Sequence, residues 1–545
     1  MRNGGDLVVE TLSALGATTV FGIPGQHALG LFDALTRSQL QFISSRVENN
    51  SAFAADGYAR ATHQPGILFV STGPGALTAL AGVQEAYASG VPMLVISSQI
   101  PEAGLGGRRK GMLHQLDDQK ASARNVTKSQ ETIHKASSIP YALEDAWQTA
   151  LTAPQGPVWV EIPQDVLLNE TSIPAPGAIN VKVPLVEPHA GSIQRAAELL
   201  ASAKRPAIIA GGGVRRSDGA AQNHLQQLAE LVDAPVVCTP GGNTAFPYEH
   251  PLSLGGWIED RYVTEVLENA DVLLAVGTSL GEVSSNYFTM EPRGQLIQID
   301  AHVRVLESNY SGLGIRSDAS IALAEITSAV QRQGDLATST WHGKTSGDLA
   351  RDVQRNIDQR LAKQDLTHEI SIMNAIRSAI PDDAVTYWDM TIAGYWAWNV
   401  WDARSGAMHS GQGAGGIGYG FPSAFGGAIG QGERVLAVSG DGSAMYSIAE
   451  LAAAKQHNVP VTWLIIDDGG YGILREYMHG AFGQATATEL ARPDFVALSE
   501  SFGIPAVTTD AAGLHEALSQ AWSTDGTNLV VLQTTLKMWD ATHEM

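Results

Sequence analysis

The sequence alternates short apolar runs with helix-like segments along most of its length, and this alternation restricts the fold more than any other feature. Strand-like runs such as "TTVFGIP", "PGILFVSTGPG", "ADVLLAVGTS" and "RVLAVSGDG" are separated by helical patterns such as "NNSAFAADGYARA". Apolar runs that alternate with helices are typical of parallel strands joined by crossover helices. We therefore expect an α/β fold built from parallel sheets.

The alternation divides into three consecutive blocks. A proline-rich stretch, "TSIPAPGAINVKVPLVEPHAG" (171–191), and a polar, helix-like stretch, "QRQGDLATSTWHGKTSGDLARDVQRN" (331–356), interrupt it. We interpret both stretches as linkers. They predict three consecutive α/β domains at residues 1–170, 188–331 and 366–545, and the length of 545 residues suits about three domains.

Composition and charge exclude several classes of protein. With a formal net charge of -22, the chain lacks the excess of basic residues that binding to nucleic acids or anionic membranes requires. No uninterrupted apolar run reaches the roughly eighteen residues of a membrane span. The single cysteine, Cys238, allows no intrachain disulfide, and "MRNGGDLVVETLSALG" lacks the pattern of a signal peptide. We expect a cytoplasmic protein with no nucleic-acid or membrane partner.

Two groups of carboxylates follow neighbouring strand-like runs near the C-terminus. Asp441 comes directly after "RVLAVSG", between Gly440 and Gly442, and Asp467 and Asp468 come directly after "VPVTWLII". Parallel strands end at one edge of a sheet, so these side chains should lie close together. Oxygen ligands at such an edge suit Mg²⁺ or Ca²⁺ with a bound diphosphate. The simpler interpretation of "GDGS" is a turn in which Ser443 caps a helix beginning near Ala444.

With both carboxylate groups taken together, the sequence resembles the thiamine-diphosphate enzymes, the family of acetolactate synthase, benzoylformate decarboxylase and benzaldehyde lyase. The family motif is glycine-aspartate-glycine followed about twenty-five residues later by paired amides or acids. The resemblance implies Mg²⁺, or alternatively Ca²⁺ or Mn²⁺, bound by Asp441, Asp468 and the main-chain carbonyl of Gly470. Relatives usually have asparagine where this chain has Asp467 and Asp468.

The resemblance also implies the catalytic residues. Glu48, in "SSRVENNSAFAADGYARA", matches the glutamate that polarises the aminopyrimidine ring of the cofactor. In "FGIPGQHALGLFDAL", Gln26 and His27 would lie over the thiazolium, and in "GMLHQLDDQ", His114 or Gln115 would face the substrate. A surface or structural histidine is the alternative for His27 and for His114.

Further residues would bind the cofactor by the same resemblance. "VSTGPGALTALAG" matches the loop next to the pyrimidine, and in "HSGQGAGGIGYGFPSAFGGAIG" the side chain of Ile417 would separate the two cofactor rings. The implied cofactor-binding residues are Gly25, Gly73, Pro74, Gly75, Thr391, Ile392, Gly415, Ile417, Gly440, Gly442, Ser443, Gly470, Tyr471 and Gly472. The three domains would then be a pyrimidine-binding, a central Rossmann-like and a diphosphate-binding domain.

The implied reaction is non-oxidative decarboxylation of a 2-oxo acid, or formation or cleavage of a C–C bond in an acyloin, through a ylide and an enamine carbanion. An acetolactate synthase catalytic subunit and a non-catalytic thiamine-diphosphate sensor are the alternatives. Synthases carry FAD in the middle domain, but "TSLGEVSSNYF" departs from their pattern, so we do not expect FAD. Tyr477 stands where synthases have a tryptophan that selects their second substrate. Because Glu48 and the metal ligands lie in different blocks, the family also implies a homodimer or homotetramer with shared sites.

Overall fold

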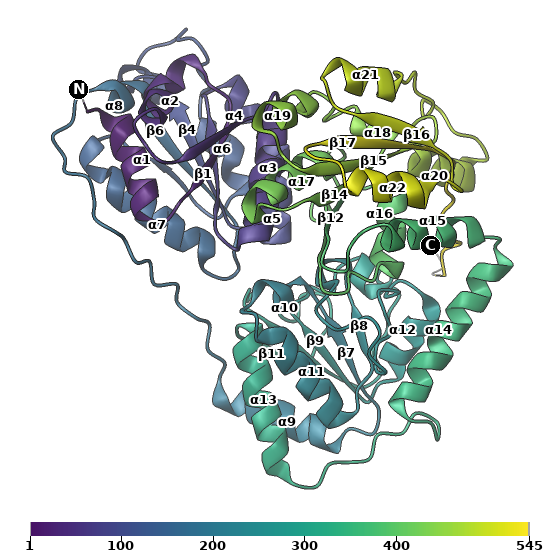
Figure 1. Cartoon of the computed structure of the whole chain (residues 1–545). Helices are drawn as coiled ribbons and strands as arrows, with labels where there is room; N and C mark the ends of the chain where they lie inside the picture. Colours follow the sequence, from purple (N-terminus) through teal and green to yellow (C-terminus); the bar gives the residue numbers. More distant parts are fainter. Residues whose placement is uncertain (1, 543–545) are drawn as a thin grey trace.

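Three parallel β-sheets follow one another along the chain, and helices pack against each of them (Figure 1). The computed structural model describes residues 2–542. Strands pair only in parallel within the three sheets of this described part. The α/β class that the alternation predicts is confirmed.

The first sheet belongs to the N-terminal unit and has six strands in the order β2-β1-β3-β4-β6-β5. Its strands are β1 (Thr19–Gly22), β2 (Gln41–Ser44), β3 (Gly66–Val70), β4 (Met93–Gln99), β5 (Gln130–Thr132) and β6 (Pro157–Pro163). Its helices are α1 (Gly4–Ala14), α2 (Leu29–Leu35), α3 (Glu48–Thr62), α4 (Pro74–Thr78), α5 (Leu80–Ser89), α6 (Gln119–Ala123), α7 (Ile139–Leu151) and α8 (Gln164–Leu168), with the 3-10 turns η1 (Gln26–Ala28), η2 (Glu102–Gly107), η3 (Arg124–Val126) and η4 (Ala136–Ser138).

The second sheet belongs to the middle unit and has five strands in the order β11-β10-β9-β7-β8. An extended segment without helix or strand, residues 171–189, leads into it. Its strands are β7 (Pro206–Ala210), β8 (Val236–Cys238), β9 (Val272–Val276), β10 (Gln295–Asp300) and β11 (Leu313–Arg316). Its helices are α9 (Ala190–Ser202), α10 (Gly212–Arg216), α11 (Ala221–Val232), α12 (Arg261–Asn269) and α13 (Ala319–Gln333), with the 3-10 turns η5 (Pro240–Gly242) and η6 (Val283–Ser285).

The third sheet belongs to the C-terminal unit and has six strands in the order β13-β12-β14-β15-β17-β16. Its strands are β12 (Val385–Trp388), β13 (Ala407–Ser410), β14 (Val435–Gly440), β15 (Val461–Asp467), β16 (Ala506–Thr509) and β17 (Asn528–Gln533). The helices are α14 (Ser346–Lys363), which forms part of the polar stretch after the middle sheet, α15 (Thr367–Ser378), α16 (Ile392–Val400), α17 (Gly420–Gln431), α18 (Asp441–Ala444), α19 (Glu450–His457), α20 (Gly472–Phe482), α21 (Phe495–Ser501) and α22 (Leu514–Trp522).

The first and third sheets have the same strand order. Counted from the first strand of each unit, the order is 2-1-3-4-6-5 in both, and the middle sheet has the order 2-1-3-4-5. In such sheets the strand order reverses between the first and third strands, and ligands bind at the carboxyl ends of these strands. Each unit therefore has one favoured place for a ligand.

Helix α3 of the N-terminal unit packs directly against helix α17 of the C-terminal unit, as Figure 1 shows. Glycine makes the close approach possible: a Cβ on Gly57 would lie 1.9 Å from Ser423 O, and one on Gly426 would lie 1.8 Å from Ala54 O. Buried apolar residues of both units form one continuous core around these helices. The two outer units are thus held together within a single chain.

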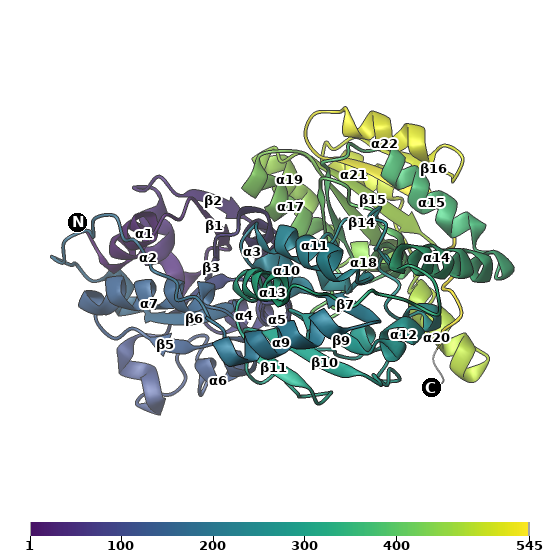
Figure 2. The same cartoon turned by 90° about the horizontal axis from the view of Figure 1, so that it is seen from below.

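The middle unit contacts both outer units, and in the view from below it lies across them (Figure 2). Arg215 in α10 donates to Met408 O of the C-terminal unit at 3.0 Å. The guanidinium of the next residue, Arg216, lies against Gly90 of the N-terminal unit. Within residues 2–542, no helix is both long and apolar enough to cross a membrane.

Candidate active site

The residues that the sequence analysis selected lie at the carboxyl ends of strands in the two outer units. In the first sheet, the loops after β1 and β3 carry Gly25, His27 and Gly73. In the third sheet, the segments after β12 and β14 carry Thr391 and Asp441. These are the places where parallel sheets of this strand order bind ligands.

Asp441 and Asp468 lie together at one edge of the third sheet, because β14 and β15 are neighbours. The side chain of Asp441 is fully buried, and neither of its carboxylate oxygens has a hydrogen-bond partner of normal geometry, the nearest cation being Arg492 with Nε 3.4 Å from Oδ2. Burial, and then the charge of Asp468, raise the pKa of Asp441 to about 7. A buried carboxylate without donors is costly unless a cation compensates its charge, so this pair is suited to a cation.

Arginine and glycine complete the surroundings of this carboxylate pair. Arg492 Nε lies 3.4 Å from Asp441 Oδ2 and donates to Asp467 Oδ1 at 2.8 Å. A Cβ on Gly472 would lie 2.0 Å from Asp468 Oδ2, so a side chain there would displace the Asp468 carboxylate. No group of three or more His, Cys, Asp or Glu side chains within residues 2–542 could hold a metal. A metal at this edge would thus take a main-chain ligand besides the two carboxylates.

Ser443 does not cap a helix, which corrects the expectation from "GDGS". Helix α18 begins at Asp441 itself, with Gly440 as its N-cap residue and no side-chain cap. The hydroxyl of Ser443 instead accepts from Gly418 N at 3.0 Å. The reason is that the glycine-rich segment before α17 lies over this turn, so that Gly418 N is shared between the Ser443 hydroxyl and a buried carboxylate. Ser443 therefore positions the segment that carries Ile417.

Asp389 has a related role, and the sequence analysis missed it. It is fully buried directly after β12, and its carboxylate accepts hydrogen bonds from the backbone of Gly418, Tyr419 and Gly420 at 2.9 to 3.2 Å. Burial raises the pKa of Asp389 despite these donors. The sequence signal was present, because Asp389 ends a third neighbouring strand in the same way as Asp441.

The other group of residues surrounds Glu48, the first residue of α3. A Cβ on Gly75 would lie 3.1 Å from Glu48 Oε1, so the carboxylate reaches the loop after β3. The backbone N–H groups of Arg46 and Val47, directly before Glu48, donate to the carboxylate of Glu450 in α19. The C-terminal unit thus fixes the start of α3 and the position of Glu48.

Two histidines lie near this carboxylate. The rings of His27 and His114 are 5.3 Å apart, and a Cβ on Gly73 would lie 2.7 Å from His114 O. Burial, and then the charge of His114, lower the pKa of His27. Both Nδ1 atoms and the hydroxyl of Ser71 are buried without a hydrogen-bond partner. These polar atoms are suited to a bound molecule that supplies their partners.

The remaining predicted residues lie at the same two places, with different exposure. Gln26 is exposed, and the amide of Gln115 bonds to Arg109 O and Gly104 O of its own loop. Thr391 is the N-cap residue of α16, and Ile392 is buried directly after it. The other predicted cofactor residues lie in the loops already described: Gly25, Pro74, Gly415, Gly442, Gly470 and Tyr471.

A buried network fixes the loop after β3 from behind. The carbonyl of the Gln119 side chain accepts from Gly73 N at 2.8 Å and from the Thr72 hydroxyl at 2.7 Å. The amide nitrogen of Gln119 donates to Glu161 Oε1 at 3.1 Å, and Trp159 donates to the same oxygen at 2.9 Å. The orientation of Gln119, and so of Gly73, depends on the Glu161 carboxylate.

We expect Gln119→Leu to raise the cofactor KM about tenfold and to lower the melting temperature, because Gly73 N and Glu161 lose their buried partner. Gln130→Leu is the matched control, since the side chain of Gln130 donates to Thr127, three residues earlier, and takes no part in the described network. Cofactor titration and thermal denaturation measure both effects. An unchanged KM in Gln119→Leu would show that the network does not position the loop.

Within the described part of one chain, the two groups of residues make no direct contact. Within residues 2–542, no hydrogen bond, ion pair or ring contact joins Glu48, His27 or Gly73 to Asp441 or Asp468. Large apolar side chains are exposed beside each group. They are Leu29, Leu77 and Leu113 near the first and Met445 and Tyr446 near the second.

The two groups fit a thiamine diphosphate and its metal. The buried carboxylate of Asp441, beside Asp468 and with Arg492 Nε no nearer than 3.4 Å, suits a divalent cation, and the unpartnered polar atoms of Ser71, His27 and His114 suit a polar ring and substrate. Asn49 next to Glu48 also has a buried oxygen without a partner. These five side chains thus place unsatisfied buried polar atoms where the cofactor and substrate would lie, although other such atoms, for example those of Trp341 and Arg377, lie elsewhere in the fold.

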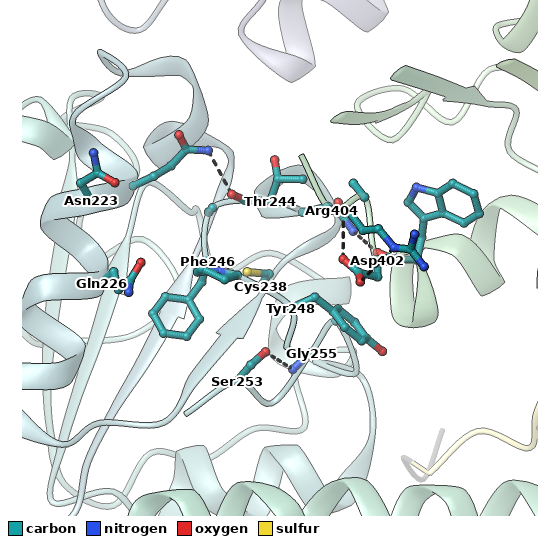
Figure 3. A pocket seen from close by; sticks show the side chains of 17 residues that line it. Asn223, Gln226, Cys238, Thr244, Phe246, Tyr248, Ser253, Gly255, Asp402 and Arg404 are labelled. Atoms are coloured by element: carbon teal, nitrogen blue, oxygen red, sulfur yellow. Dashed lines mark hydrogen bonds and ion pairs between the residues drawn. The ribbon is translucent and has the colours of Figure 1, made fainter. Parts of the chain in front are cut away.

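A separate cavity of about 230 Å³ lies between the middle and C-terminal units (Figure 3). Its lining includes Cys238, Phe246, Tyr248 and Asp402, and it contains no predicted site residue. Burial raises the pKa of the Cys238 thiol to about 11. This cysteine is therefore a structural residue of the edge strand.

We expect Cys238 to react slowly with iodoacetamide in the native protein. At pH 8 a thiol with this pKa is ionised in only about one molecule in a thousand, and the thiolate is the nucleophile. The measurement is mass spectrometry of the native and the denatured chain after equal exposure. Equal labelling of the two states would contradict the assignment.

Comparison with known proteins agrees with this geometry. Three family models match: "Thiamine pyrophosphate enzyme, N-terminal TPP binding domain" at residues 2–122, "central domain" at 193–326 and "C-terminal TPP binding domain" at 389–532. A "Probable 2-ketoarginine decarboxylase" from Pseudomonas aeruginosa is 32% identical, covering 92% of this chain and 88% of its own length. A "Probable acetolactate synthase large subunit" from Methanocaldococcus jannaschii is 30% identical (92% and 87%), and the acetolactate synthase isozyme 1 large subunit of Escherichia coli is 28% identical (92% and 88%).

The fold and the site thus define an enzyme that uses thiamine diphosphate, and the resemblance seen in the sequence is confirmed. The chain belongs to the thiamine pyrophosphate enzyme family. Within that family it is a decarboxylase or carboligase, and the synthase type remains an open alternative.

Proposed function

We propose that this enzyme acts on 2-oxo acids, releasing CO₂ and then either protonating the acyl unit to an aldehyde or joining it to a second carbonyl compound. The observation that carries the proposal is the presence of two groups: Glu48 beside the Gly73–Gly75 loop, and the buried carboxylate of Asp441 beside Asp468. The first group supplies a proton-transferring carboxylate. The second supplies a cation site for a diphosphate.

Each residue has a defined task in this proposal. Asp441, Asp468 and the carbonyl of Gly470 hold Mg²⁺, or Ca²⁺ or Mn²⁺, against the diphosphate. Bound thiamine diphosphate supplies a thiazolium that accepts the electron pair left by the departing carboxylate. Glu48 holds or moves a proton at the aminopyrimidine, and Ile417 fills the space between the two rings.

The substrate side of the site is built from the N-terminal unit. His27 and His114 face one another beside Gly73, and each has an unpartnered ring nitrogen. They orient the substrate carboxylate and exchange protons with the product. Gln26 and Gln115 lie in the same two loops and contribute when these loops close on the substrate.

The test is turnover of purified enzyme with Mg²⁺ and thiamine diphosphate on pyruvate and on longer aliphatic, aromatic and basic 2-oxo acids. CO₂, aldehyde and acyloin are followed separately. Acyloin from two pyruvates would favour the acetolactate synthase alternative, which two of the three reported relatives suggest by name. No turnover with any 2-oxo acid or acyloin would favour the non-catalytic sensor.

A homodimer or homotetramer with sites shared between subunits follows from the separation of the two groups. One chain brings Glu48 and another brings Asp441, and the exposed Leu77, Leu113 and Met445 become covered in the assembly. Sedimentation should give a mass of at least twice the 57.6 kDa of one chain. A monomer that retains activity would refute the shared site.

We also propose that the enzyme carries no FAD. The switch point of the middle sheet is filled by contact between its own glycine loops: Gly213 N donates to Gly277 O at 2.9 Å, and a Cβ on Gly277 would lie 2.6 Å from Gly213 Cα. A nucleotide at that position would have to displace this contact. An absorption spectrum without a flavin band is the expected result.

The domain limits and the location belong to the same proposal. Residues 1–170 bind the pyrimidine, 188–331 form the Rossmann-like spacer and 366–545 bind the diphosphate. Limited proteolysis should therefore cut first within residues 171–191. The net charge of -22 and the single cysteine support a cytoplasmic location, which cell fractionation tests.

A further inference from the structure

A buried carboxylate and three tyrosines meet where the middle and C-terminal units join. Glu259 lies just before α12, Tyr287 follows η6, Tyr395 is in α16 and Tyr477 is in α20. The Tyr287 hydroxyl and Asn399 Nδ2 donate to the Glu259 carboxylate, the latter at 3.2 Å. The hydroxyls of Tyr395 and Tyr477 are hydrogen-bonded to each other. We call Glu259 and the three tyrosines the Glu259 cluster.

The charge of Glu259 has no cationic partner within the described residues. Its side chain is only 7% exposed, and burial raises its pKa. Neighbouring buried acids differ: Asp260 pairs with Arg360, and Glu268 pairs with Arg261. Buried carboxylates are normally paired, because an unpaired charge in a low-dielectric site is costly. The cluster thus lacks one cation.

The cluster lies close to the proposed diphosphate site. Helix α16 begins directly after Thr391 and α20 begins at Gly472, and Ile392 Cδ1 lies 3.4 Å from the position of a Cβ on Gly472. Tyr395 is one helical turn beyond Thr391, about 6 Å along α16. Tyr477 is in the second turn of α20. Its side chain is 48% exposed, so the cluster is accessible from solvent.

We propose that the Glu259 cluster binds a cationic group at the end of the 2-oxo acid substrate that lies away from the carbonyl. A guanidinium has the charge and the planar shape that suit this cluster best. This inference rests on the proposed function and names its substrate class. Glu259 provides the opposite charge, and the tyrosine rings offer faces on which a planar cation stacks. The carbonyl end of the same substrate lies toward Glu48 and the cofactor, several bonds away from the cation.

The test compares two substrates of similar length, 5-guanidino-2-oxopentanoate and the uncharged 2-oxoheptanoate, with pyruvate as a third. The wild-type enzyme should prefer the guanidino substrate. Glu259→Gln keeps the shape but removes the charge, so we expect kcat/KM for the guanidino substrate to fall about 100-fold, mainly through KM. Turnover of pyruvate and 2-oxoheptanoate should stay within about threefold.

Controls separate charge recognition from a structural role. Glu187→Gln removes an exposed carboxylate from the segment before α9, outside the cluster, and should leave kcat/KM for all three substrates unchanged. Glu259→Asp should restore part of the preference. Equal loss on all three substrates, or a wild type without preference for the guanidino substrate, would overturn the inference. If Glu259→Gln does not fold, the wild-type preference alone decides. Failure of the proposed function is distinct, because then none of the three substrates is turned over.

Discussion

Glu48→Gln should lower kcat by about 10²- to 10⁴-fold, the range that a positioned proton-transferring group contributes. Glutamine has the same shape, so the start of α3, the contact with Gly75 and the bonds of Arg46 and Val47 to Glu450 should persist. The substitution removes only the carboxylate for which we propose proton exchange with the aminopyrimidine. Steady-state turnover with the best 2-oxo acid is the measurement.

Binding should remain nearly intact in this variant. The cofactor affinity by calorimetric titration should stay within about tenfold, because the cation and diphosphate contacts belong to the other group of residues. Glu131→Gln, an exposed carboxylate on β5, is the matched control. A rate within about threefold of wild type would remove Glu48 from the catalytic machinery.

Asp441→Asn should abolish the stabilisation of the protein by Mg²⁺ and thiamine diphosphate, and with it all turnover. The cation loses its most buried ligand, and Asp468 alone cannot hold it against the diphosphate. In the absence of ligands, however, the variant should melt about 2 °C higher than the wild type, since a repulsive buried charge beside Asp468 is gone.

Thermal denaturation with and without both ligands measures the two effects together. Asp525→Asn, at an exposed position, should show the ordinary ligand-dependent shift. A normal shift in Asp441→Asn would place the cation elsewhere. The opposite signs of the two expected effects distinguish loss of a ligand from simple damage to the fold.

Mixing the two inactive variants tests the shared site. A hybrid dimer of Glu48→Gln and Asp441→Asn chains has one site with both substitutions and one with neither. Half of randomly mixed dimers are hybrids, so about a quarter of wild-type activity should return. No recovery after refolding the variants together would mean that each chain builds its own site.

The sequence could predict much of the site because the decisive residues follow strands directly. Asp441 and Asp468 end two apolar runs, and parallel strands bring such ends to one edge. The helix cap expected at Ser443 is wrong, because the partner of its hydroxyl, Gly418, comes from a segment 25 residues away. The local sequence pattern predicts that the hydroxyl caps the nearest helix, whereas a tertiary contact determines its hydrogen-bond partner.

Other contacts were beyond the sequence for the same reason. Glu450 binds the backbone before Glu48 across about 400 residues, and Glu259 meets Asn399 across 140. The local sequence around a single glutamate predicts neither its hydrogen-bond partner nor its burial when no motif surrounds it. The strand order, which brings the site residues together, also depends on long-range pairing that single-sequence periodicity does not contain.

The separation of the two groups of residues links cofactor binding to enzyme concentration. If each site needs two chains, dilution removes sites as it removes dimers, and added cofactor pulls the chains together again by mass action. Specific activity should therefore fall when the enzyme is diluted into cofactor-free buffer and recover slowly when cofactor returns. The apparent cofactor affinity of this enzyme is then a property of its working concentration in the assay.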